Sequence, residues 1–269
     1  MAKGGTKSGT EASRSETLLA GVEQIVVGGA RCARLDLEDT ARLMIDLAKT
    51  PARATGPYYL TSINGEVLAR RAFDPAFAAL VDDADLVSAD GQPLVTASRL
   101  FSQHGLPERV CTTDLYPIVA RMAAEAGVSF YLFGASEEVN RATFDLTRRS
   151  FPGLDIRGRS HGYLSGAALD DKLDEINALA PDILWVAMGV PLEQDFVRRH
   201  ARRLPNVKMI KTSGGLFDFM SGAKKRAPKW MRSIGLEWAF RVWLEPRRLL
   251  KRYVTTNPVA LMLLVTRTR

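Results

Sequence analysis

Between residues 128 and 211, short apolar segments alternate with longer amphipathic ones, and this alternation restricts the folds open to the chain. The amphipathic segments have the length of helices, about 10–15 residues, and the apolar ones have the length of strands. Ile183–Ala187 is apolar at every position, which is typical of an interior strand covered on both faces. Such strands pair in parallel through right-handed helical crossovers. The sequence therefore predicts an α/β fold, a mostly parallel sheet with helices on both faces. The expected strands are Tyr58–Ile63, the segment ending at Asp90, Val128–Phe133, Leu154–Gly158, Ile183–Ala187 and Val207–Lys211.

The chain before this sheet predicts a tail and a hairpin. The first 17 residues are rich in Gly, Ser, Thr and Lys and have no apolar core, so we expect a disordered tail over residues 1–20. This composition matches neither a signal peptide nor a membrane anchor. Gln24–Val27 and Ala30–Leu35 flank two glycines and predict a β-hairpin. We expect the α/β core to occupy residues 21–222.

The basic charge of the chain is concentrated at its C-terminal end. Residues 224–269 hold 12 Lys and Arg against two acidic residues, whereas the rest of the chain has a net charge of −3. Three of the four tryptophans lie in the same segment, and Pro246 predicts the start of a second helix there. Basic, tryptophan-bearing amphipathic helices suit an anionic membrane surface, although a plain docking helix is the alternative. The apolar run Val259–Val265 is far below the ~20 residues that cross a bilayer. Residues 223–269 are therefore predicted to form a membrane-associating helical appendage.

Asp90 follows a short apolar strand and precedes a glycine, which makes it a candidate catalytic residue. In an open α/β sheet, ligands bind beyond the carboxyl ends of the strands. Asp before Gly is also a common turn pair, so its position alone leaves a structural role open. Glycine turns follow other strands at Gly134, Gly189 and Gly214. Free N–H groups at such turns favour phosphates, while steric demand is the alternative reason for glycine there.

Other common site types have little support in the sequence. No GxGxxG follows the first strand and no GxxxxGK[ST] occurs, which disfavours dinucleotide and P-loop sites. The three histidines and two cysteines have no metal-ligand spacing. Asp83 and Asp85 have the DxD spacing of a divalent-metal motif, but we expect them at a helix end before a strand. No metal and no cofactor are predicted.

Several short motifs, in order, resemble the WecG/TagA/CpsF family of bacterial glycosyltransferases, glycosyltransferase family 26. The resemblance runs from about Gly21 to Tyr253, nearly the whole folded chain. The motifs are the Asn64 loop, Ala89-Asp90-Gly91, Pro107-Glu108-Arg109-Val110, Phe133-Gly134-Ala135, His161-Gly162-Tyr163, Gly189-Val190-Pro191, Gly214-Gly215-Leu216-Phe217-Asp218, Arg226-Ala227-Pro228, Gly235-Leu236-Glu237-Trp238, Arg241 and Glu245-Pro246-Arg247-Arg248.

The resemblance implies a Rossmann-like core with a basic C-terminal appendage, acting peripherally at the cytoplasmic membrane face. It implies an inverting, metal-independent transfer of a sugar, of the N-acetylmannosamine type or a hexose. The donor would be a UDP-sugar and the acceptor a polyprenyl-diphosphate-linked saccharide, in surface or exopolysaccharide synthesis. Asp90 would be the general base. The residues that would bind substrate are Ser62, Asn64, Arg109, Gly134, Gly189, Glu193, Gln194, Arg241, Arg248 and Lys251.

The sequence departs from the usual family pattern at several positions. Glu193 and Gln194 stand where the family usually has Gln and then Glu, which leaves the role of each open. Ser62 replaces the more common threonine and Thr112 a glycine. Lys251 replaces an arginine, which keeps the charge and loses the bidentate fork.

Arg241, Arg248 and Lys251 are spaced by seven and three residues, which puts them on one helical face if the helix continues through Pro246. These fixed cations would balance the charge that develops on the leaving diphosphate. Two other functions stay open. A nucleic-acid binder is disfavoured by the acidic remainder of the chain, and a catalytically idle membrane adaptor with the same fold is left room by the Glu193/Gln194 exchange. The sequence also leaves the oligomeric state open, including a homo-oligomer.

Overall fold

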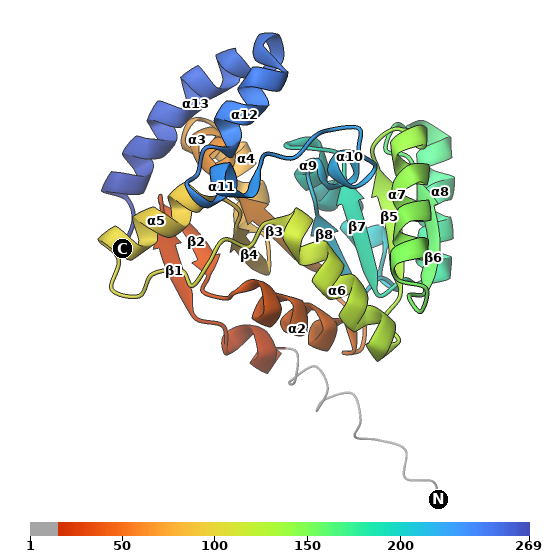
Figure 1. Ribbon diagram of the computed structural model, residues 1–269. Coiled ribbons are helices and arrows are strands. Elements are labelled where there is room, and N and C mark those ends of the chain that lie inside the picture. The colour runs from red at the N-terminus through yellow and green to blue at the C-terminus, as the bar shows by residue number, and fades with distance from the viewer. Residues whose placement is uncertain (1–15) are drawn as a thin grey trace, which may run out of the picture.

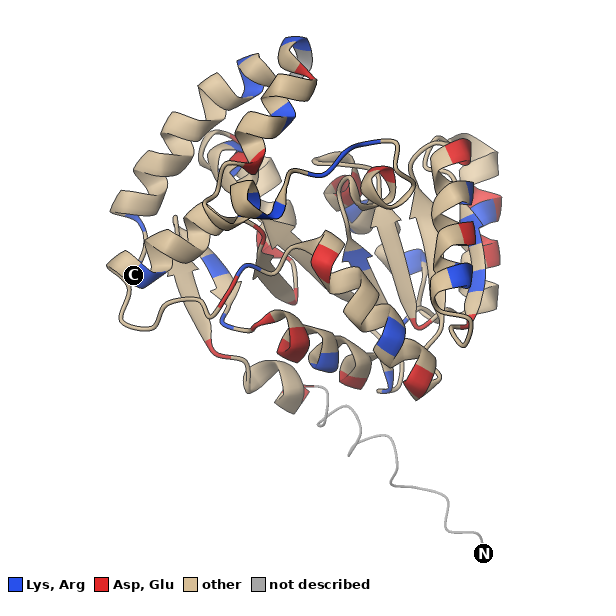
Figure 2. Cartoon of the chain, in the orientation of Figure 1, with Lys and Arg blue, Asp and Glu red and all other residues tan. Residues whose placement is uncertain are grey.

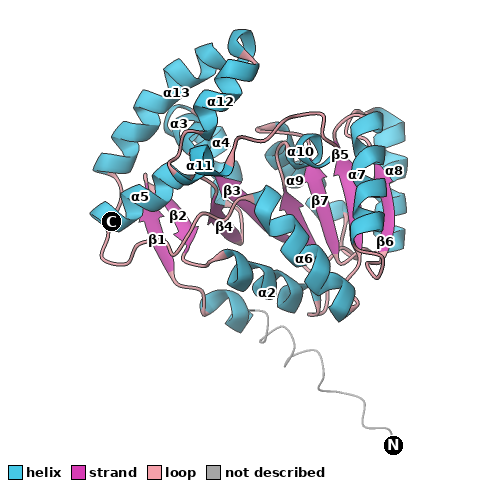
Figure 3. Cartoon of the chain, in the orientation of Figure 1, coloured by secondary structure: helices cyan, strands magenta, loops and turns pink. Residues whose placement is uncertain are grey.

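The structure, a computed structural model, describes residues 16–269 and contains two sheets within that range. The larger sheet has six strands in the order β4-β3-β8-β7-β5-β6, and every pair in it is parallel (Figures 1 and 3). The predicted parallel α/β fold is confirmed. The strands are β3 (Tyr58–Ile63), β4 (Leu86–Ala89), β5 (Phe130–Gly134), β6 (Ile156–Ser160), β7 (Ile183–Ala187) and β8 (Met209–Thr212).

Helices cover both faces of this sheet. One face packs against α2 (Leu37–Ala48), α6 (Thr112–Ala126), α7 (Glu137–Ser150) and α10 (Leu216–Met220). The other packs against α8 (Gly166–Leu179) and α9 (Leu192–His200). The helices between β3 and α6 are α3 (Gly65–Phe73), α4 (Pro75–Asp82) and α5 (Gln92–Phe101).

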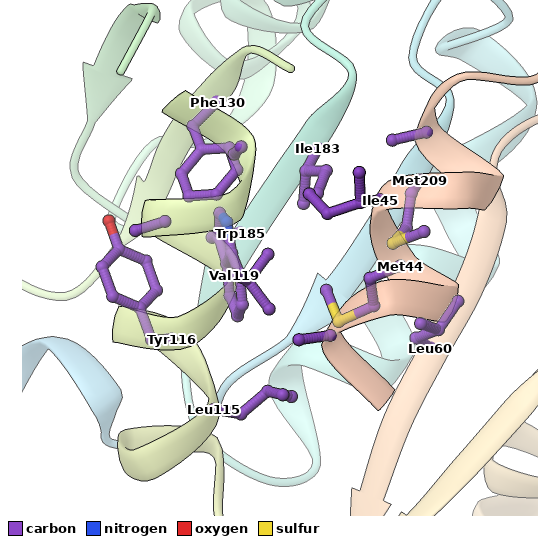
Figure 4. Packing of buried hydrophobic residues seen from close by; sticks show 14 of the residues in the cluster. Met44, Ile45, Leu60, Leu115, Tyr116, Val119, Phe130, Ile183, Trp185 and Met209 are labelled. Carbon is purple, nitrogen blue, oxygen red and sulfur yellow. The ribbon is translucent and has the colours of Figure 1, made fainter. Parts of the chain in front are cut away.

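Trp185 lies at the centre of the core on the α6 side of the sheet. Its ring meets Tyr116 edge-on at a centroid distance of 4.8 Å and lies 5.6 Å from Phe130. Figure 4 shows side chains of α2 and α6 packed over the strands from the same side. Tilted and edge-on aromatic pairs of this kind add about 0.5–1.5 kcal/mol each to the burial of their apolar surface. The alternating apolar strands of the sequence thus form a continuous core beneath these two helices.

A separate hairpin joins the N- and C-terminal parts of the described chain. Strands β1 (Gln24–Val27) and β2 (Ala30–Ala33) pair antiparallel as predicted, although β2 ends before Leu35. The chain after α13 returns to this hairpin, where the Arg269 N–H donates to the Val26 carbonyl at 3.0 Å. Of the tail predicted over residues 1–20, residues 1–15 lie outside the described range, and residues 16–20 are helical.

The appendage is a set of three helices, α11 (Lys229–Ser233), α12 (Glu237–Leu244) and α13 (Pro246–Thr266). Pro246 occupies the first turn of α13, as predicted, because proline lacks only an N–H that this turn leaves free. α13 packs along α3 and α5, and α12 packs against α13 (Figure 1). None of the helices in residues 16–269 combines the length and the apolar character that a membrane crossing needs.

Some boundaries differ from those the sequence predicts. β6 starts at Ile156 instead of Leu154, since Leu154 is buried from a turn, in which its N–H donates to the Phe151 carbonyl at 3.0 Å. An apolar residue in such a turn gives the same local signal as the first residue of a strand. Helix α6 starts two residues before Asp114, which places that carboxylate in its first turn.

Candidate active site

The strand ends at the carboxyl edge of the large sheet bring together residues that are far apart in the sequence. Ile63 and Ala89 are paired in register, so Asn64 and Asp90 follow neighbouring strands at the same level. α4, which follows β3, contacts α9 on one face, whereas α10, which follows β8, contacts α6 on the other. The point where successive helices change faces is where ligands bind in open α/β sheets. The end of β3 therefore marks the candidate active site.

Asp90 lies at this edge as a partly buried residue whose backbone is fixed. Its N–H donates to the Ile63 carbonyl at 2.7 Å. Burial raises the pKa of Asp90 above its ordinary value, and the nearby charges of Arg109 and Arg241 and a hydrogen bond from the Cys111 thiol only partly offset this. A carboxylate with a raised pKa is a stronger base than an ordinary aspartate. The position and the environment of Asp90 both suit proton abstraction.

Ser62 is held at the end of β3 by a buried lysine that sequence reasoning missed. The Lys211 Nζ atom donates to Ser62 Oγ at 2.8 Å and to the Thr212 carbonyl at 3.1 Å. Lys211 is buried on β8, between β3 and β7. A lysine at the carboxyl end of the predicted strand Val207–Lys211, directly after Met209 and Ile210, was the signal that could have found it.

Asn64 has a structural task in addition to any contact with substrate. Its side-chain Oδ1 accepts the Val67 N–H at 3.1 Å and caps α3. Asn is among the residues that satisfy helix N-termini best. The Asn64 amide group is thereby fixed at the carboxyl edge, beside the strand that leads to Asp90.

A network of arginines and carboxylates connects the core to the appendage. Arg109 donates to Glu237 of α12 at 3.1 Å and to Asp114 of α6 at 3.3 Å. Glu237 also accepts from Arg241, one turn further along α12, while Arg226 pairs with Asp114 through two hydrogen bonds of 2.7 Å. The network brings together Arg109 and Arg241, which were predicted site residues, and adds Glu237 and Asp114, which were not. Figure 2 shows acidic and basic residues meeting where the chain crosses from core to appendage.

The pKa values in this network follow from its ion pairs. Burial alone would raise the pKa of Asp114, but the hydrogen bonds and charge of Arg226, with those of Arg109 and Arg232, outweigh it and hold the pKa below its ordinary value. Burial acts in the same way on Glu237, and there the charges of Arg241 and Arg109 lower the pKa overall. Both carboxylates therefore stay ionised at neutral pH and keep the guanidinium groups in place.

The three predicted cations of the appendage do not share one continuous helical face. Glu245 has non-helical backbone angles (φ −133°, ψ 61°), so α12 ends before it and α13 begins after it. Arg241 lies in α12, partly buried beside Glu237, whereas Lys251 is exposed on α13. The side chain of Arg248 lies outside the part of the chain that the structure describes. The charge of Arg241 acts on Asp90.

The glycine turns serve the backbone in two different ways. At Gly134 (φ +130°), a Cβ atom would lie 2.2 Å from the Ala187 carbonyl oxygen, so this glycine permits the close approach of β5 and β7. The N–H groups of Gly189 and Gly214 donate to Glu193 Oε2 at 3.2 and 2.8 Å. They are therefore occupied by a protein carboxylate and are not the free N–H groups that the sequence predicts.

Glu193 and Gln194 are both buried at the start of α9. Burial raises the pKa of Glu193 to about 7, against the lowering effect of its backbone hydrogen bonds and of Lys211. The Gln194 amide donates weakly to Glu193 Oε1 at 3.5 Å, and its own Oε1 is buried with no hydrogen-bond partner among the described residues. In the exchanged pair, the acidic residue thus faces the two glycine turns.

The DxD pair lies away from the site. Asp85 receives two hydrogen bonds from Arg53, of 2.8 and 2.9 Å, and one from the Tyr59 N–H at 2.7 Å, at the amino end of β4. Asp83 ends α4, as predicted. Within residues 16–269, no three His, Cys, Asp or Glu side chains are grouped so that they could hold a metal ion.

Comparison with known proteins agrees with this arrangement. The profile of the glycosyl transferase WecG/TagA/CpsF family matches residues 25–269. The chain belongs to this family. It is accordingly a glycosyltransferase, and the resemblance drawn from the sequence motifs is confirmed.

Curated relatives of this WecG/TagA/CpsF family member share most of its length. A protein of Bacillus spizizenii is 30% identical over 73% of this chain and 77% of its own, and one of Bacillus subtilis is 29% identical over 76% and 78%. A protein of Staphylococcus aureus is 26% identical over 80% and 84%. Each is named N-acetylglucosaminyldiphosphoundecaprenol N-acetyl-beta-D-mannosaminyltransferase.

Proposed function

We propose that this glycosyltransferase moves a sugar of the N-acetylmannosamine type, or a hexose, from a UDP-sugar to a polyprenyl-diphosphate-linked saccharide. The names of its relatives support this acceptor and this sugar class. The observation that carries the proposal is the position of Asp90 at the carboxyl edge of the sheet, under the charges of Arg109 and Arg241. The catalytically idle adaptor has no such support, because an adaptor would have no use for Asp90, Arg109 and Arg241 at this position.

In the proposed reaction, Asp90 removes the proton from the acceptor hydroxyl group as that oxygen attacks the anomeric carbon. The new C–O bond forms opposite the bond between the anomeric carbon and the diphosphate oxygen. That bond breaks and UDP leaves with its electron pair, so the anomeric configuration inverts. A general base of this kind contributes roughly 10²–10⁴-fold to the rate. Asp90 follows β4 at the carboxyl edge of the sheet, the side from which the acceptor would approach it.

Fixed guanidinium groups would balance the charge that develops on the leaving diphosphate. Arg241 reaches the site from α12 and Arg109 from the loop before α6, and Glu237 holds both in place. Preorganised cations in a partly buried site are often the largest catalytic contribution, since they need no reorganisation during the reaction. We propose Arg248 and Lys251 as further contacts to the donor, and a reaction independent of divalent metal.

We place the reaction at an anionic membrane surface on the cytoplasmic side. Large apolar side chains are exposed along the appendage, among them Trp230 (63% exposed), Trp243 (75%) and Val254 (64%). A groove of about 310 Å³ runs between α12 and α13, lined by Trp238, Val242, Leu250, Tyr253, Val254, Asn257 and Pro258. Exposed apolar side chains beside Lys and Arg suit the interface of an anionic bilayer.

The test is an assay of the purified chain with a panel of UDP-sugars and a synthetic polyprenyl-diphosphate-N-acetylglucosamine in vesicles. We expect UDP release and a glycolipid product with one donor, with and without a chelator. Asp90→Asn should lower kcat by roughly 10²–10⁴-fold. The matched control is Asp83→Asn, at an exposed aspartate at the end of α4, which should keep wild-type turnover.

Near-wild-type turnover of Asp90→Asn would remove Asp90 as the base. Activity that is lost with a chelator and restored by manganese would contradict the metal-independent mechanism. The absence of product with every UDP-sugar, together with membrane binding, would favour the adaptor function instead.

A further inference from the structure

Lys211 is a buried cation that the proposed reaction does not use. It is 1% exposed, at the carboxyl end of a strand in the middle of the sheet. The charged or titratable groups that act on it are Glu193 of α9, Asp90 after β4 and Cys111 before α6. No ion pair within 4.0 Å reaches its ammonium group from residues 16–269, and the group donates hydrogen bonds to Ser62 Oγ and the Thr212 carbonyl. A buried ammonium group without a direct ion pair is costly, which calls for a reason to keep it.

The chemistry of the Lys211–Ser62 contact fixes the direction of the serine hydroxyl group. An ammonium group has three donors and no acceptor, so Ser62 Oγ must accept the 2.8 Å hydrogen bond. The Ser62 proton is therefore directed away from Lys211. Within the described residues, its one other side-chain neighbour is Thr112 Oγ1 at 3.5 Å, a weak contact at the limit of hydrogen bonding. The Ser62 hydroxyl group is thus an oriented donor, and its only acceptor among the described side chains is the distant Thr112 Oγ1 atom.

The Ser62 hydroxyl group lies at the end of β3, next to β4, which Asp90 follows directly. Ser62 and Ser88 are paired in register, and Asp90 follows two residues after Ser88. A donor held at this point can serve an oxygen atom of a bound substrate, such as a sugar hydroxyl or a diphosphate oxygen. Donors fixed before the reaction are worth more than mobile ones, because they cost no reorganisation as charge develops.

We propose that Lys211 is a positioning residue that fixes Ser62 as a hydrogen-bond donor to substrate oxygen at the carboxyl edge of the sheet, next to Asp90. The inference rests on the proposed function and assigns Lys211 no contact with substrate. It also gives a reason for an acidic residue at position 193, because the negative charge of Glu193 stabilises the ammonium form of Lys211.

The contact predicts a specific pH dependence. Burial lowers the pKa of Lys211 to about 8, and Glu193, Asp90 and Cys111 act in the opposite direction. A neutral amine can accept a hydrogen bond, so above this pH the Ser62 proton is free to turn inward. The wild-type kcat should therefore fall as the pH rises through about 8. A Ser62→Ala enzyme lacks the hydroxyl group, so its kcat should not show this alkaline fall.

The experiment is a double-mutant cycle with Lys211→Met, Ser62→Ala and the double variant, in the same UDP-release assay with wild type alongside. Each single variant should lower kcat roughly 10–100-fold, the effect of one charge-assisted or oriented hydrogen bond. The double variant should be no slower than Ser62→Ala alone. Ser62→Thr keeps the hydroxyl group and should retain most activity. Lys208→Met is the control, because that lysine bonds the Thr50 carbonyl at 2.8 Å at the opposite end of β8 and should keep wild-type kcat.

Multiplying effects in the double variant, or an unchanged kcat in Lys211→Met, would overturn the inference. If Lys211→Met does not fold, the wild-type and Ser62→Ala pH profiles decide, and an alkaline limb shared by both overturns it. An inactive wild type would overturn the proposed function and this inference with it, whereas an active wild type with independent effects overturns this inference alone.

Discussion

Glu193 shows how a single side chain changes what a glycine turn can bind. Glycine turns after β7 and β8 present N–H groups that suit an anion. Both N–H groups instead meet one carboxylate oxygen of Glu193, at 3.2 and 2.8 Å. The anion-binding capacity of these turns is thus used inside the protein. In the proposed reaction, the donor diphosphate would therefore be bound by side-chain cations and not by these two N–H groups.

Replacing Glu193 with Gln tests its electrostatic effect on Lys211. The amide oxygen can still accept the two glycine N–H groups, but the negative charge is lost. Because that charge raises the pKa of Lys211, its removal should move the pKa further below about 8. If the ammonium form is the active one, the alkaline limb of the kcat profile should shift to lower pH in Glu193→Gln. Profiles of the two enzymes measured side by side check this, and an alkaline limb at an unchanged pH would contradict it.

Gly134→Ala tests whether this glycine is required by the backbone. The new Cβ atom would lie 2.2 Å from the Ala187 carbonyl oxygen, at a φ of +130°. We expect the free energy of unfolding to fall by at least about 2 kcal/mol, since both a clash and backbone strain result. Gly127→Ala is the control, with a φ of +68° and no atom within 4 Å of its Cβ, and should cost about 1–2 kcal/mol. Urea unfolding measures both, and equal losses would show that the contact with Ala187 is not limiting.

At the scale of elements, the sequence predicts what depends on local periodicity. The predicted strands Tyr58–Ile63 and Ile183–Ala187 coincide with β3 and β7. The second helix predicted from Pro246 is α13, and Glu245 before it is non-helical, because proline disfavours the helical conformation of the residue that precedes it. The strand-end position of Asp90 could likewise be predicted. The pairing of Arg109 with Glu237, 128 residues away, could not, since it depends on how the appendage folds over the core.

The docking of α12 on the core should depend on the charge of Glu237. Its pKa is lowered overall by Arg241 and Arg109, so its stabilising contribution is present above the unfolded pKa and is lost as the pH falls through the folded one. Glu237→Gln should weaken this docking by about 2 kcal/mol at neutral pH. Amide hydrogen exchange in α12 should then be faster, and the wild type should show the same change as the pH falls below the ordinary pKa of a glutamate. Glu138→Gln, at an exposed residue of α7, should leave this exchange unchanged.

At the scale of the whole molecule, the appendage and the carboxyl edge of the sheet lie at the same end. The strands point their carboxyl ends toward the side on which α11 and α12 lie (Figure 3). α13 continues from there and returns to the hairpin (Figure 1). A membrane that meets α12 and α13 would therefore lie on the side of the molecule that holds the candidate active site.

This orientation predicts that cations of α13 matter for membrane binding more than equal charges elsewhere. Arg247 and Lys251 are exposed on α13, and each Lys or Arg near an anionic bilayer is worth about 1 kcal/mol. The double variant Arg247→Gln/Lys251→Gln should therefore bind anionic vesicles roughly 30-fold more weakly. Arg148→Gln/Arg149→Gln removes the same charge from exposed sites on α7 and should bind like wild type. Vesicle flotation measures the binding of both variants. Equal losses would mean that net charge, and not the appendage, governs membrane binding.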